Sequence, residues 1–204
     1  MRFSNIHIPA KRLTACLLGL ALMGAASSAV AQGGMSPPED NRSFVKLDPS
    51  IKAMFLAEMR KDLENLDDIL TAIAEKKFEL AARIAERKMG LAHRRIERME
   101  ANGASDEEIA ATVKKIRKMG EKVGDMPVKE LHRKMSQGMM GVGNFMPDEL
   151  QGVGQAFHLS AYDIADAARL VAKKPDAANY QKLFSAINDM TTHCRGCHDA
   201  YRVR

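Results

Sequence analysis

Aromatic residues are scarce in this chain of 204 residues, which has no Trp, seven Phe and three Tyr. No stretch shows the alternation of apolar and polar residues that marks a strand, whereas Ala, Leu, Met and charged residues are abundant. This composition argues against a sheet-rich fold and predicts an all-α protein. Cysteine is scarce as well: only Cys194 and Cys197 lie beyond the first 31 residues, so we expect no structural disulfide.

The first 31 residues are predicted to be a signal peptide. A basic start with Arg2, Lys11 and Arg12 precedes an apolar run that is too short to cross a bilayer, and Ala29-Val30-Ala31 forms a cleavage site. Cleavage after Ala31 removes three of the 31 Lys and Arg and none of the 26 Asp and Glu, so the net charge falls from +5 to +2. We therefore expect a periplasmic protein and no nucleic-acid partner.

The exported chain is predicted to hold a flexible, Gly- and Pro-rich leader over residues 32–46 and one domain over residues 47–204. The expected fold is an antiparallel four-helix bundle with an additional helix in the connection between the second and third helices. The sequence gives start and stop signals for five helices, which are expected from Asp48-Pro49 onward and at about 77–100, 106–119, 147–173 and 176–202.

The first helix carries an apolar stripe that is expected to face the core. Its members recur every three or four residues: Phe55, Met59, Leu63, Leu66, Leu70 and Ile73. The opposite face, with Asp62 among its charged residues, is expected to be solvated.

The last twelve residues contain Cys194-Arg195-Gly196-Cys197-His198, a Cys-x-x-Cys-His sequence that signals covalent attachment of c-type haem. On a helix, residues three and four positions apart share a face, so both thiols can reach neighbouring haem substituents while His198 reaches the iron. A thioredoxin-like thiol pair fits less well, because no strand precedes the motif. A zinc site that adds His193 also fits less well, because no second ligand pair follows.

The ending Cys194-Arg195-Gly196-Cys197-His198-Asp199-Ala200-Tyr201-Arg202 resembles that of class II c-type cytochromes, the cytochrome c′ family, and residues 69–85 resemble it too. The likeness hardly covers residues 102–146. It implies a periplasmic bundle with one covalent haem c, His198 as proximal iron ligand, and dimers formed through the first two helices. It also places Arg202 beside the proximal histidine, although Arg202 can equally be a solvated charge that pairs with a propionate.

The sixth iron ligand separates two subclasses of this family. Met59 is the favoured candidate and would give low-spin iron suited to electron transfer. An apolar distal side would instead leave five-coordinate iron open to NO or CO, and His158 or His93 are further candidates. We expect His158 to be buried with a hydrogen bond and His93 to be solvated.

The sequence therefore predicts a mono-haem electron carrier rather than an enzyme, with periplasmic or membrane-bound redox proteins as partners. The alternative is a gas-binding cytochrome c′. Tyr201, Phe55 and Leu63 are expected to line the haem pocket. A group of methionines in the 102–146 insert, together with His132, could bind Cu(I), although a flexible hydrophobic cover over the haem edge is the simpler and favoured interpretation. Its members are Met135, Met139, Met140 and Met146.

Overall fold

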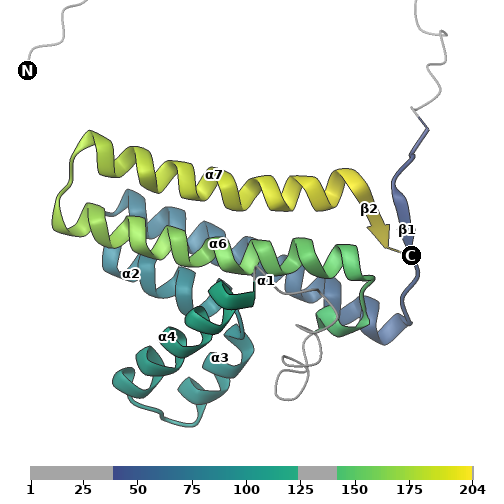
Figure 1. The fold of residues 1–204 in the computed structure, drawn as a ribbon, viewed down its shortest axis with the longest axis horizontal. Coiled ribbons are helices and arrows are strands. Elements are labelled where there is room, and N and C mark those ends of the chain that lie inside the picture. Colours follow the sequence, from purple (N-terminus) through teal and green to yellow (C-terminus); the bar gives the residue numbers. More distant parts are fainter. Residues whose placement is uncertain (1–38, 124–141, 204) are drawn as a thin grey trace, which may run out of the picture. The chain divides into compact units, whose positions relative to one another are not determined.

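The computed structural model describes residues 39–123 and 142–203, and Arg42–Arg204 forms one compact unit (Figure 1). The predicted signal peptide, most of the leader, His132 and Met135, Met139 and Met140 lie outside the described residues. The elements in chain order are β1 (Ser43–Val45), α1 (Pro49–Ala74), α2 (Phe78–Ile84), the π-helical turn η1 (Ala85–Met89), α3 (His93–Ala101), α4 (Asp106–Val123), the 3-10 turn η2 (Val142–Phe145), α6 (Asp148–Lys173), α7 (Ala177–Ala200) and β2 (Tyr201–Val203).

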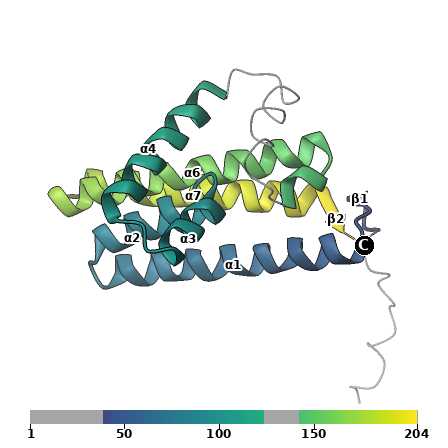
Figure 2. The same ribbon diagram turned by 90° about the horizontal axis from the view of Figure 1, so that it is seen from below.

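The predicted all-α class is confirmed. One apolar core, which includes Ile69, Ala81, Ile164 and Leu183, draws side chains from α1, from α2 with η1, from α6 and from α7. Figures 1 and 2 show α6 and α7 running side by side, with α1 and α2 against them. None of the described helices is long and apolar enough to cross a membrane.

Local signals set most of the helix ends. Pro49 begins α1 directly after Asp48, and Asp176 caps α7 by accepting a hydrogen bond from the Asn179 backbone N–H at 2.9 Å. Before α4, the Ser105 hydroxyl accepts from the Glu108 N–H at 3.2 Å, and the Glu108 carboxylate accepts from the Ser105 N–H at 2.9 Å. This reciprocal pair is a capping box.

The sequence predicted that the second helix would continue to about residue 100, but α2 ends at Ile84. It passes into the π turn η1 and breaks at Gly90, and the chain restarts as α3 after Ala92, whose φ is +59°. Gly90 permits the break because a Cβ there would lie 2.4 Å from the Glu86 carbonyl oxygen and 2.9 Å from the Tyr162 ring. The connection to α6 therefore contains α3 as well as the expected α4, and these two helices project from α1, α2, α6 and α7 (Figure 1).

The buried face of α1 is also rotated relative to the predicted stripe. Leu63 is 68% exposed and Leu70 42%, whereas Asp62 is only 8% exposed and Asn65 1%. Asn65 can be buried because its side-chain amide donates to the Lys88 carbonyl in η1 at 3.3 Å. The expectation that Asp62 lies on a solvated face was wrong, because contacts with η1 and α3 decide which side of a broadly apolar helix turns inward.

A short parallel strand pair, which the sequence did not predict, closes the fold. Ser43 pairs with Tyr201, Phe44 with Arg202 and Val45 with Val203. The first strand lies within the segment expected to be a flexible leader, and the second takes the place of the last turn predicted for the final helix. The two strands are only three residues long and lie far apart in the sequence. Neither segment therefore carries a local residue pattern that predicts their pairing.

Candidate haem attachment site

The Cys-x-x-Cys-His sequence lies in the last two turns of α7, where helical spacing brings the two cysteines to one face. Cys194 and Cys197 are both free thiols and both half-buried, whereas the ring-bearing His198 is exposed. The helix ends just after the motif, where the Tyr201 N–H donates to the Cys197 carbonyl. The three motif residues are therefore fixed on a regular helix and remain accessible.

Cys197 belongs to a small apolar cluster at the end of the fold where β1, the start of α1 and the start of α6 meet. Val45, Met146 and Leu150 are its buried centre, and Phe55 and Tyr201 pack against them together with Cys197. Two of the predicted pocket residues, Phe55 and Tyr201, therefore belong to the same apolar cluster as Cys197. Met146, one of the methionines offered as a hydrophobic cover over the haem edge, lies in this cluster too, and the structure adds Val45, for which the sequence gave no indication.

Cys194 packs against the main core instead, close enough to Asp62 for the two to interact electrostatically. Burial raises the pKa of the Cys194 thiol, and the Asp62 carboxylate raises it further. Burial also raises the pKa of Cys197. A dithiol of the thioredoxin type needs a lowered pKa to supply a reactive thiolate, so these thiols are poorly suited to that chemistry.

Asp62 is the polar neighbour that the sequence analysis missed. Burial raises the pKa of its carboxyl to about 6; His93 acts against this shift and Glu97 adds to it. A buried carboxyl with a perturbed pKa next to a motif residue is a functional candidate. Its position in the sequence placed it on the helix face opposite the apolar stripe, and that position did not indicate burial.

The histidines named as alternative iron ligands are engaged elsewhere. The His158 Nδ1 donates to the Met89 carbonyl at 2.8 Å, and its ring lies 5.0 Å from the His93 ring, centre to centre. Burial and the neighbouring His93 lower the pKa of His158 to about 4. The predicted hydrogen bond of His158 is confirmed, and its side chain is partly buried. His93, which was expected to be solvated, is 15% exposed and lies 3.3 Å from a Glu58 carboxylate oxygen, so that expectation was wrong.

The other predicted residues lie on α1 and in β2. Met59 is half-buried on α1, and Leu63 on the same helix is largely exposed. Arg202 lies in β2, where its guanidinium carbon is 5.2 Å from the centre of the Phe44 ring.

These residues fit a covalently attached haem. The two thiols are free and neutral, one helical turn apart, and each packs against a different apolar cluster, so a macrocycle joined to both would rest on apolar surface. The adjacent imidazole is unburied and can turn toward an iron.

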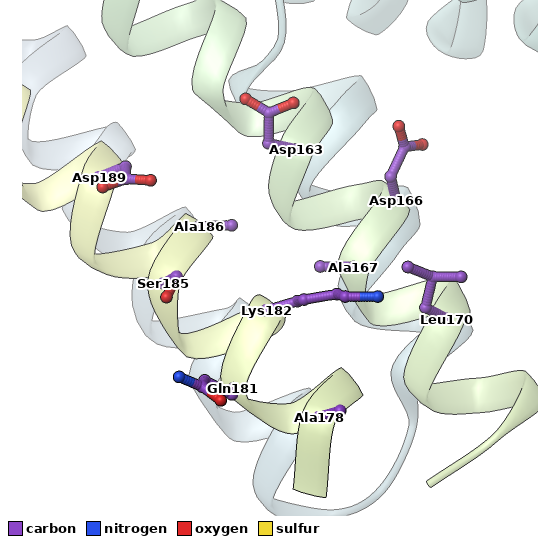
Figure 3. A pocket seen from close by; sticks show the side chains of 10 residues that line it. All are labelled: Asp163, Asp166, Ala167, Leu170, Ala178, Gln181, Lys182, Ser185, Ala186 and Asp189. Carbon is purple, nitrogen blue, oxygen red and sulfur yellow. The ribbon is translucent and has the colours of Figure 1, made fainter. Parts of the chain in front are cut away.

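A separate surface hollow of about 540 Å³ lies between α6 and the first half of α7. Figure 3 shows Asp163, Asp166, Asp189 and Lys182 among the residues that line it, together with three alanines. Its residues on α7 all precede the haem motif, so it forms no part of this site.

Comparisons with protein-family models, with curated proteins and with solved structures give no match. The relation to class II c-type cytochromes therefore stays a prediction from the residues quoted above.

Proposed function

We propose that this chain is an exported mono-haem c-type cytochrome that carries electrons in the periplasm. The haem is attached through Cys194 and Cys197, and His198 is the proximal iron ligand. When bound, haem supplies an iron that takes up and releases one electron. The exchange partners are other periplasmic or membrane-bound redox proteins, and the chain itself turns over no substrate.

The observation that carries this proposal is the arrangement of two free, half-buried thiols and an exposed imidazole on the last turns of α7. Residues around the motif supply the remaining roles in the proposed site. Phe55 and Tyr201 keep water from the Cys197 side, and Met59 is the candidate distal ligand. The Asp62 carboxylate near Cys194 favours the more positively charged state of any centre beside it, so it lowers the reduction potential.

A gas-binding function is the second candidate, and the packing of Phe55 favours it. Phe55 is an apolar side chain of α1, one turn before Met59, and it already shares a cluster with Cys197. If Phe55 rather than Met59 covers the distal side, the iron stays five-coordinate and open to NO or CO.

Absorption spectra of the ferric and ferrous protein, with and without CO, distinguish the two functions. Electron transfer through a Met-ligated centre predicts low-spin spectra and slow, weak CO binding. Immediate CO binding by a high-spin ferrous form would make gas binding the function. Spectra without any haem bands in the exported, purified chain would contradict both. The proposed dimer through the first two helices can be examined on the same sample by sedimentation.

A further inference from the structure

We propose that the segment Arg42–Val45 is a clasp that positions the proximal histidine, with Arg42 and Phe44 as its two positioning residues. The inference rests on the proposed function, because it concerns how His198 is held toward the iron. It assigns a role to the start of the domain, a region in which the sequence gave no reason to look.

The first contact is between Arg42 and the motif itself. The Arg42 guanidinium donates to the backbone carbonyl of His198 at 3.3 Å. The last four carbonyls of a helix have no partner within the helix, and a cation near them is favoured by the helix dipole. Arg42 therefore supplies both a donor and a positive charge to the turn of α7 that carries the imidazole.

The second contact is the strand pairing that follows. The three residues after Arg42 pair in parallel with the three residues after α7, and Val45 is buried in the same cluster as Cys197 and Tyr201. The ends of a helix fray unless they are held by other contacts. Because β2 begins only three residues after His198, the strand pairing holds the end of α7 that carries the imidazole.

The third contact concerns Arg202. Its guanidinium lies over the Phe44 ring, a cation–π arrangement. Phe44 is 43% exposed, so burial alone does not explain its position. The contact with the Phe44 ring holds the Arg202 guanidinium on β2. It thereby fixes the position of a positive charge relative to His198.

Partners beyond the first ligands usually orient a metal-bound histidine and tune its metal. The clasp acts in this way through the backbone carbonyl of His198 and through the strand that follows it. A clasp that only stabilised the fold would not change the iron–imidazole bond. That difference is the basis of the test.

The experiment uses the exported, haem-loaded chain carrying Arg42→Gln together with Phe44→Ala. Lys46→Gln is the matched control, because it removes one positive charge from an exposed residue just beyond β1. Hydrogen–deuterium exchange is measured on peptides covering residues 194–203. The iron–imidazole stretching band of the five-coordinate ferrous form is measured by resonance Raman spectroscopy. If a sixth ligand hides this band, it is recorded on the five-coordinate species that photodissociation of bound CO leaves.

We expect exchange in residues 194–203 to become about tenfold faster in the double variant and to be unchanged in the control, since two contacts of moderate strength are lost. The iron–imidazole band should shift or broaden in the double variant alone, and Arg42→Lys with Phe44 intact should restore most of the wild-type band. A band identical to that of the control overturns the proposal, whether or not exchange is faster. Exchange equal to the control overturns it as well. A wild-type chain without covalent haem contradicts the proposed function itself, and this is seen on a haem-stained gel before any variant is compared.

Discussion

Replacing Asp62 with Asn should change how stability depends on pH. Asp62 is 8% exposed, and burial raises the pKa of its carboxyl from 3.8 to about 6. Between these two values the folded protein binds more protons than the unfolded chain. Its free energy of unfolding therefore falls as the pH rises through this range and levels off above the folded-state pKa.

The size of this fall follows from the shift. A difference of about two pKa units corresponds to about 3 kcal/mol between the two protonation states. Asn has nearly the same shape and no charge to bury, so Asp62→Asn should be more stable than wild type by about 2 to 3 kcal/mol above pH 7. The advantage should shrink toward zero near pH 4.

Urea unfolding followed by circular dichroism at pH 4, 5, 6 and 7.5 measures this profile. Asp68→Asn is the control, because it makes the same chemical change at an exposed position of the same helix. Parallel profiles for wild type and Asp62→Asn would refute the reasoning, as would the same pH-dependent gain in Asp68→Asn. If the account of the carboxylate charge holds, Asp62→Asn should also raise the reduction potential of the haem-loaded protein.

Met59→Ala should make the ferrous protein bind CO readily and lower its reduction potential, because a thioether that favours Fe(II) is lost. Leu66 is partly buried on the same helix, so Leu66→Ala should lower the free energy of unfolding in urea by about 2 kcal/mol and leave the spectrum unchanged. Identical CO binding by Met59→Ala and wild type would show that Met59 is no ligand. Gly90→Ala should cost about 1 to 3 kcal/mol in urea unfolding, because its Cβ would meet the Tyr162 ring at 2.9 Å. Gly152→Ala, in α6 with nothing within 4 Å, should stabilise by about 0.5 to 1 kcal/mol, and a loss equal to that of Gly90→Ala would be evidence against the steric argument.

Features set by neighbouring residues could be predicted from the sequence. The capping box at Ser105, the proline after Asp48 and the start of α6 at Asp148 were all read at or within a residue or two of their positions. Each depends on hydrogen bonds or steric limits within one turn of the chain. The motif cysteines are in the same class, because their common face follows from helical spacing alone.

Features that depend on contacts between distant parts of the chain could not be predicted from the sequence. The burial of Asp62 depends on which side of α1 meets η1 and α3, and apolar residues on that helix cover too wide an arc to settle the choice. The break at Gly90 follows from the approach of Tyr162, more than 70 positions later. The pairing of Ser43–Val45 with Tyr201–Val203 joins the two ends of the domain, and no pattern in either segment indicates it.

The attachment of haem through Cys194 and Cys197 is the central claim, and denaturing electrophoresis tests it most directly. The chain is exported in cells that mature c-type cytochromes, and the gel is stained for haem peroxidase activity beside the variants Cys194→Ala and Cys197→Ala and the double variant. The account predicts a haem-stained band at the size of the wild-type polypeptide, a weaker band for each single variant, and none for the double variant. Haem that acidified organic solvent extracts from the wild-type chain, or a band that survives in the double variant, would contradict it.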